Sequence, residues 1–83
     1  MAEYEIIYSE TAREDLDALP PRQAAQIVRK IGRLQSGLVG DINRLQEHDS
    51  AYRLRMGNYR VLFDVAGGNI IIRRVKDRKE AYD

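Results

Sequence analysis

The chain has 83 residues, a formal net charge of +1 and no cysteine, so we expect one small domain over residues 1–83 that contains no disulfide and no thiolate metal site. The absence of cysteine fits a cytoplasmic protein. The acidic start, Met1-Ala2-Glu3-Tyr4-Glu5, does not match a signal peptide, and no segment reaches the length that spans a membrane.

The first half of the chain predicts a strand followed by two helices. Residues 4–8 are aromatic and β-branched, as is typical of strands. Ser9 or Thr11 can cap a first helix, which Pro20-Pro21 ends. Pro21 also suits the first turn of a second helix, which Gly37 or Gly40 ends. The apolar stripe of that second helix consists of Ala24, Ile27, Val28, Ile31 and Leu34.

The second half predicts an antiparallel meander of three strands. Residues 38–51 are irregular, and residues 52–56 and 59–63 then read as strands joined by a tight turn at Gly57-Asn58. A second turn at 66–69 leads into a last, strongly apolar strand over 70–75. This order predicts an α+β fold with an N-terminal strand, an α-helical hairpin and the meander. The helices should pack on the face formed by Tyr52, Leu54, Met56, Val61 and Phe63.

Three arginines fall on the opposite face of the predicted hairpin. Side chains alternate along a strand, so Arg53, Arg55 and Arg60 share the face that looks away from the helices. A two-residue turn places Arg55 directly opposite Arg60, which is unfavourable for a sheet. Residues 52–83 also carry eight Lys and Arg against four Asp and Glu. This placement indicates a surface that binds phosphate, and the alternative is a solvated polar face.

Two further features bear on this interpretation. Continuing the register places Arg74 on the helix-covered face, unless a bulge or an ion pair with Asp17 or Asp64 accommodates it. His48, the one histidine, lies beside acids in the irregular segment, without the spacing of a metal site. We therefore expect no metal and no cofactor, and we interpret His48 as a surface residue.

The run Tyr-Arg-Leu-Arg-Met-Gly-Asn-Tyr-Arg-Val-Leu-Phe over residues 52–63 resembles the RelE branch of the RelE/ParE toxin superfamily. The last strand, Ile-Ile-Ile-Arg-Arg-Val, and the following Arg-Lys-Glu-Ala-Tyr extend the resemblance over the whole chain. The resemblance implies a RelE-like domain, similar to small microbial ribonucleases. It implies the toxin of a type II toxin–antitoxin pair, a metal-independent endoribonuclease that enters the ribosomal A site and cuts mRNA there.

The resemblance also implies the site residues and the reaction. The residues that surround the scissile phosphate would be Arg53, Arg55, Arg60, Arg78 and Tyr82, with RNA contacts from Arg73, Lys76 and Lys79. The 2′-hydroxyl would attack the adjacent phosphate while arginines stabilise the developing charge. Some members have lysines at the positions of Arg53 and Arg55, which leaves Tyr82 as the best proton acceptor.

Two alternative functions remain open, and every reading includes a partner protein. A ParE-like inhibitor of DNA gyrase shares the fold but usually lacks the full basic set. A catalytically weak toxin would act mainly by binding its antitoxin and repressing their operon; Asp77, where many relatives carry a histidine or lysine, favours this reading and could instead serve as base. In each case we expect an antitoxin partner, bound at a small hydrophobic groove near Leu16, Leu19 and Ile27.

Overall fold

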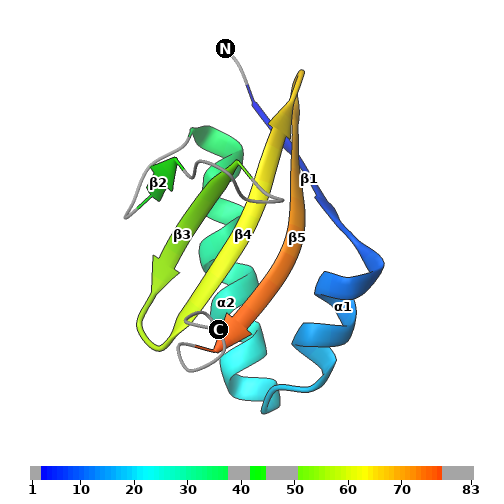
Figure 1. Ribbon diagram of the computed structural model, residues 1–83, viewed down its shortest axis with the longest axis vertical. Helices are drawn as coiled ribbons and strands as arrows, with labels where there is room; N and C mark the ends of the chain where they lie inside the picture. Colours follow the sequence, from blue (N-terminus) through cyan, green and yellow to red (C-terminus); the bar gives the residue numbers. More distant parts are fainter. Residues whose placement is uncertain (1–2, 38–41, 45–50, 78–83) are drawn as a thin grey trace.

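The computed structural model describes residues 3–37, 42–44 and 51–77 and has the expected α+β fold (Figure 1). Its elements in chain order are β1 (Glu5–Tyr8), α1 (Glu10–Asp17), α2 (Pro21–Gly32), the 3₁₀ helix η1 (Arg33–Ser36), β2 (Ile42–Arg44), β3 (Tyr52–Met56), β4 (Tyr59–Ala66) and β5 (Asn69–Asp77). The sequence interpretation of residues 38–51 as irregular is wrong for the short strand β2, because its three residues are too few to show an alternation.

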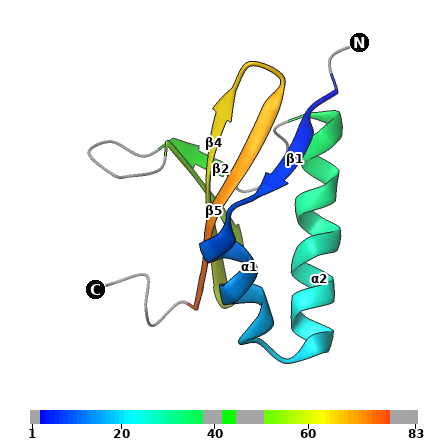
Figure 2. The same cartoon turned by 90° about the vertical axis from the view of Figure 1, so that its right-hand side faces the viewer.

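One five-stranded sheet connects the two ends of the chain, with the order β1-β5-β4-β3-β2. The first strand runs parallel to the last, and the other neighbours are antiparallel, so β3, β4 and β5 form the expected meander. Both helices lie on one side of this sheet, whereas no described helix covers the other side (Figure 2). The fold therefore leaves one face of β3, β4 and β5 for side chains that do not belong to the core.

The core lies between α2 and the sheet, on the predicted face. Leu54, Met56, Val61 and Phe63 are buried there, and the ring of Tyr52 stacks on Phe63 with the centroids 5.4 Å apart. Each fully buried large apolar side chain stabilises the fold by about 1.5–3 kcal/mol. Ile27, Ile31 and Leu34 supply the helical side of the core. Val28 was assigned to the same stripe but is 42% exposed, because it lies on the flank of α2.

Ser9 fixes the corner between β1 and α1. Its hydroxyl oxygen accepts a hydrogen bond from the backbone N–H of Ala12 at 3.0 Å, so Ser9, and not the alternative Thr11, caps the helix. The same hydroxyl donates to the carbonyl of Arg73 at 2.9 Å, and the Ser9 N–H donates to the carbonyl of Ile72. The cap therefore also ties α1 to β5.

A β-bulge resolves the position of Arg74. Leu62 pairs with Arg74 and the next residue, Phe63, pairs with Ile72, so β5 contains one extra residue, Arg73. The shift brings Arg74 into the row of Leu62, away from the buried row of Val61. A bulge was one of the two solutions expected from the sequence, and it is confirmed.

The ion pair of Arg74 involves a different acid from those expected. Arg74 Nε donates to Asp15 Oδ2 at 2.8 Å, and Asp15 also accepts from the backbone N–H of Val75 at 2.9 Å. Neither Asp17 nor Asp64 is the partner. Pairing of β1 with β5 ends at Tyr8 and Ile72, so α1 reaches the edge of β5 beyond that point, and Asp15 satisfies its donors.

Candidate nucleic-acid interface

The β3–β4 hairpin has the register expected for the predicted arginines. Gly57 adopts φ +55°, a conformation that favours glycine, and the two-residue turn pairs Met56 with Tyr59 and Arg55 with Arg60. On the other side of β4, Arg60 pairs with Lys76 of β5. Three cations from three strands therefore form one row across the sheet, Arg55–Arg60–Lys76.

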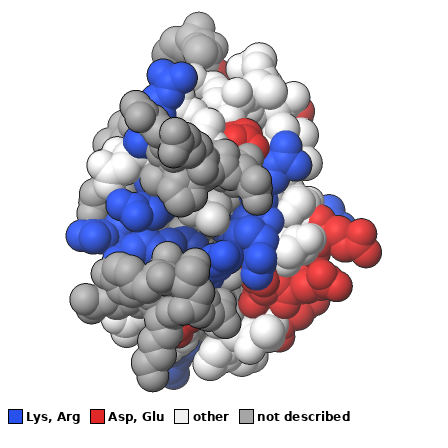
Figure 3. Space-filling model, in the orientation of Figure 1, with Lys and Arg blue, Asp and Glu red and all other residues white. Residues whose placement is uncertain are grey.

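Three further cations extend this row into a set of six that we call the basic face. Its members are Arg53, Arg55, Arg60, Arg73, Arg74 and Lys76. Figure 3 looks onto the side of the sheet that carries no helix, and its Lys and Arg atoms form a band across β3, β4 and β5. Acidic side chains gather beside this band, at the position of α1. The charge asymmetry of the sequence thus becomes a spatial separation on one side of the molecule.

Arg60 lies at the centre of the row and is buried, with 5% of the residue exposed. Its Nη1 donates to the backbone carbonyls of Gly57 at 3.2 Å and Tyr59 at 3.1 Å. Within the described parts of the chain, no carboxylate pairs with its guanidinium. We expected an outward-facing arginine; the structure instead holds a buried cation whose bonds to the turn fix its orientation.

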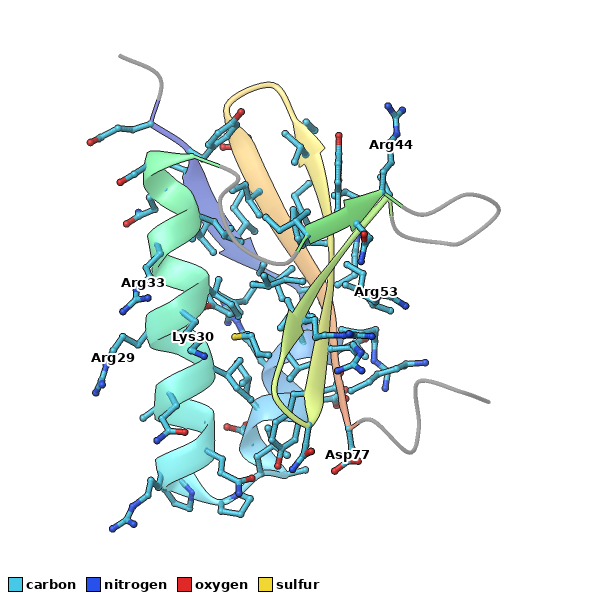
Figure 4. All side chains as sticks on the ribbon, turned by 90° about the vertical axis from the view of Figure 1, so that its left-hand side faces the viewer. Arg29, Lys30, Arg33, Arg44, Arg53 and Asp77 are labelled. Carbon is cyan, nitrogen blue, oxygen red and sulfur yellow. The ribbon has the colours of Figure 1, made fainter. Side chains whose placement is uncertain are left out.

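Arg53 has a donor without a partner. It lies on β3 opposite Leu62, and Figure 4 shows its side chain on the side of the sheet away from α2. Its Nε atom is buried, and no described residue accepts a hydrogen bond from it. A buried unsatisfied donor costs about 1–3 kcal/mol. An anion bound at the basic face would satisfy it.

Arg73, predicted as an RNA contact, also has a structural role. Its Nε donates to Asp64 Oδ2 at 2.9 Å, and the second carboxylate oxygen of Asp64 accepts from the N–H of Ala51. Its side chain is 50% exposed. Arg73 therefore anchors the start of β3 to β5 through Asp64 and still presents donors at the margin of the basic face.

Asp77 lies in a different row from the arginines. It pairs with Tyr59, which in turn pairs with Met56, so its register places it one row beyond Arg60 and Lys76. Asp77 therefore lies beside the row of Arg55, Arg60 and Lys76 and not within it. Arg78, Lys79, Tyr82 and the surface assignment of His48 lie outside the described residues.

The basic face supplies charge and hydrogen-bond donors. Guanidinium groups offer planar forks that match phosphate oxygens, and strands hold them more rigidly than loops do. The searched part of the chain, residues 3–37, 42–44 and 51–77, contains no cluster of three potential metal ligands. No described helix is long and apolar enough to cross a membrane. The arrangement can bind a phosphate and stabilise negative charge that develops on it.

A cavity on the other side of the sheet was not predicted in its observed position. It lies between α2 and the β3–β4 turn and includes Ile27, but not Leu16 or Leu19, which are half-buried and pack against the core. The spacing of Gln23, Ile27 and Lys30 places them on one side of α2. This spacing is the signal in the sequence from which the helical wall of the cavity could have been predicted. Only the pairing of that side with the turn makes a cavity.

Comparison with known proteins identifies the family. The sequence model described as the ParE toxin of the type II toxin–antitoxin system parDE matches residues 6–82. Toxin RelE3 of Methanocaldococcus jannaschii is 34% identical, with 94% of each chain covered. The toxin–antitoxin complex RelBE2 of Mycobacterium tuberculosis matches with a TM-score of 0.80 and 31% identity over 94% of each chain.

A second solved structure agrees with this assignment. The RelB–RelE antitoxin–toxin complex of Methanococcus jannaschii matches with a TM-score of 0.75 and 33% identity, covering 93% of this chain and 95% of the other. The family model and these relatives each extend over nearly the whole chain, including the hairpin and the strand that form the basic face. The chain belongs to the RelE/ParE family of toxins of type II toxin–antitoxin systems.

Proposed function

We propose that this toxin is a ribosome-dependent endoribonuclease that cuts mRNA in the A site, in the cytoplasm. The observation that carries the proposal is the pair of arginines at the centre of the basic face. Within the described parts of the chain, buried Arg60 has no carboxylate partner and the buried Nε of Arg53 has no acceptor. Both groups are costly for the fold alone, and both are suited to an anionic ligand that supplies the missing acceptors.

The reaction follows from these groups and the chemistry of RNA. The 2′-hydroxyl attacks the adjacent phosphorus, a P–O bond to it forms, and the bond to the 5′-oxygen of the next nucleotide breaks. The 5′-oxygen takes up a proton and leaves as a free 5′-hydroxyl, and the other product is a 2′,3′-cyclic phosphate or, after water opens the ring, a 3′-phosphate. Arg53, Arg55 and Arg60 stabilise the charge on the phosphate oxygens, and Lys76 holds the RNA backbone. The ribosome orients the substrate.

We assign proton transfer and the outer RNA contacts to the segment after β5. In this proposal Tyr82 accepts the proton of the 2′-hydroxyl, and Arg78 completes the set of arginines. Arg73 and Lys79 contact the RNA. We give Asp77 no part in proton transfer, because its register places it outside the row of Arg55, Arg60 and Lys76. A Tyr82→Phe variant that retained full cleavage would remove Tyr82 from this role.

The direct test is incubation of the purified protein with programmed ribosomes, followed by primer extension on the message. Arg60→Ala should lower the cleavage rate by at least about a hundredfold, as loss of a preorganised donor to the reacting oxygen does. Arg13→Ala is the matched control, because Arg13 is an exposed arginine of α1 outside the basic face. Equal cleavage by the two variants would contradict the proposal.

Inhibition of DNA gyrase is the second candidate, since the matching family model is described as the ParE toxin of parDE. A supercoiling assay with purified gyrase separates the two activities. A toxin that blocks gyrase and leaves the message intact on ribosomes supports this candidate. A toxin inactive in both assays supports a role confined to antitoxin binding and repression.

We also propose that the protein binds an antitoxin. The two toxin structures described above were solved as complexes with an antitoxin, and each aligns with at least 93% of this chain. Size-exclusion chromatography of the co-expressed pair tests this point independently of either activity.

A further inference from the structure

Within the described parts of the chain, one side-chain hydrogen bond joins α2 to the β3–β4 hairpin. The hydroxyl of Tyr59 donates to Oε1 of Gln23, which lies in the first turn of α2. Both residues line the cavity between the helix and the β3–β4 turn, which has a volume of about 230 Å³. Figure 1 shows the turn at the same end of the molecule as the start of α2. The bond therefore crosses a space that side chains do not fill.

Tyr59 connects this bond to Arg60. Its side chain reaches α2 on one side of the sheet, whereas the guanidinium of the next residue, Arg60, lies on the other side. Nη1 of Arg60 donates to the carbonyl of Tyr59 at 3.1 Å and to the carbonyl of Gly57 at 3.2 Å. Both described acceptors of the Arg60 guanidinium thus belong to the turn that Gln23 holds.

The turn depends on this bond because its own two residues are not packed. Gly57 and Asn58 are exposed, and the space around Gly57 is open. Gly57 adopts φ +55°, and glycine has access to many other backbone conformations. Atoms that border a cavity also lack attractive contacts on that side. A hydrogen bond from the adjoining Tyr59 to a helix therefore restricts motion that packing leaves open.

We propose that Gln23 and Tyr59 are positioning residues for Arg60. Their hydrogen bond fixes the turn relative to α2, and the carbonyls of Gly57 and Tyr59 then hold the guanidinium in the orientation that meets the phosphate. Neither side chain contacts the substrate, since both line the cavity on the side of the sheet away from the basic face. The inference rests on the proposed function in one respect, namely that Arg60 acts on the reacting phosphate.

A positioning role predicts an effect on the rate of reaction and not on binding. A misplaced donor stabilises the transition state less well, while attraction between the charges of toxin and message is retained. Gln23→Leu and Tyr59→Phe should each lower the maximal single-turnover rate of mRNA cleavage on ribosomes by about tenfold. The toxin concentration that gives half of this rate should change by less than about twofold.

Two variants separate the hydrogen bond from other effects of the substitution. Gln23→Glu keeps an acceptor oxygen for the Tyr59 hydroxyl and should retain the cleavage rate within about twofold. Gln26→Leu makes the matched change at a second exposed glutamine that lines the same cavity, and should also stay within about twofold. Urea denaturation of each variant verifies that the protein in the assay is folded.

Combined variants test whether the effect passes through Arg60. In an Arg60→Ala background, Gln23→Leu should leave the residual cleavage rate unchanged, because the group that it positions is absent. Gln23→Leu combined with Tyr59→Phe should be no slower than either single variant, since each removes the same hydrogen bond.

The restraint on Arg60 is also measurable without any cleavage. NMR of the ¹⁵N-labelled full chain reports how fast the guanidinium rotates about its Nε–Cζ bond, and Arg60→Met identifies the signal by its loss. Hydrogen bonds from Nη1 slow this rotation in the wild type. Gln23→Leu and Tyr59→Phe should accelerate it by about fivefold, as the weakening of one hydrogen bond does, and Gln26→Leu should not.

Four results would overturn the inference. These are full cleavage by Gln23→Leu, an equal loss in Gln23→Glu, an equal further loss when Gln23→Leu is added to Arg60→Ala, or an unchanged rotation of the Arg60 guanidinium. The rotation is scored on the free protein, independently of ribosomes. Faster rotation in variants of a toxin that leaves the message intact would refute only the nuclease. Unchanged rotation in variants of a toxin that cuts the message would refute only the positioning role.

Discussion

Replacement of Arg60 by methionine distinguishes a basic face that serves a ligand from one that serves the fold. In a structural ion pair, removing one buried partner costs about 3–5 kcal/mol, because the other charge stays buried and uncompensated. Arg60 has no such partner among the described residues, and its neighbours across both strands, Arg55 and Lys76, carry the same charge. The substitution should therefore cost much less than the burial of Arg60 implies.

The contacts of Arg60 give the size of the expected change. Loss of the hydrogen bonds to Gly57 and Tyr59, at 3.2 and 3.1 Å, costs about 1 kcal/mol each. Relief of repulsion from two like charges directly opposite returns about 0.2–1 kcal/mol for each neighbour. Methionine keeps an apolar stem in the same place. The free energy of unfolding should change by less than about 2 kcal/mol, while mRNA cleavage is lost.

Urea denaturation at two salt concentrations measures this prediction. Raising NaCl to about 1 M shortens the screening length to about 3 Å, which relieves the repulsion around Arg60 in the wild type. The wild type should therefore gain more stability from salt than Arg60→Met does. Arg73→Met is the matched control, since Arg73 donates to Asp64 and salt should weaken this favourable pair. A loss above about 3 kcal/mol in Arg60→Met, or the same salt response in both variants, would refute the reasoning.

Three further predictions concern the fold. Asp15→Ala should lower the free energy of unfolding by about 2–3 kcal/mol in urea, because it removes the acceptor of three hydrogen bonds from β5. Asp17→Ala on the exposed side should cost less than about 0.5 kcal/mol. Gly57→Ala should cost about 1 kcal/mol in the same assay, since φ is +55° and the space around it is open, and Gly68→Ala, without a positive φ, should cost less. Burial raises the pKa of Tyr8 above 10.0, so the unfolded chain loses the phenol proton at a lower pH than the folded chain does. Tyr8 should therefore leave the free energy of unfolding unchanged below about pH 10 and should lower it above that pH. An equal decline of stability over that range in a Tyr8→Phe variant would contradict this.

Much of the basic face was predictable because it depends on local patterns. The alternation of residues 52–63 and the Gly57-Asn58 turn predicted which side chains share a face and that Arg55 lies opposite Arg60, and the register confirms both. The Ser9 cap and the break at Pro20-Pro21 are equally local signals, and both appear in the structure. Each of these signals comes from residues that are close together in the sequence or that a single tight turn brings together.

Other features depend on contacts between distant residues. Pairing of β1 with β5 joins residues more than sixty positions apart, and no periodicity in either strand specifies that partner. The bulge at Arg73 was an open alternative, and the choice of Asp15 over Asp17 or Asp64 follows from where α1 meets the edge of β5. The burial of Arg60 likewise contradicts the expectation of an exposed arginine.

The hairpin register and the element types other than β2 thus followed from the sequence, because backbone alternation, turn chemistry and helix caps act over short separations. The family was indicated by the resemblance of the run over residues 52–63. The folded chain was needed to show which strands are neighbours, which acid pairs with Arg74, that Arg60 is buried, and that α2 meets the turn in a cavity. These outcomes depend on how the whole chain packs, and each of them is a balance among contacts from several elements at once.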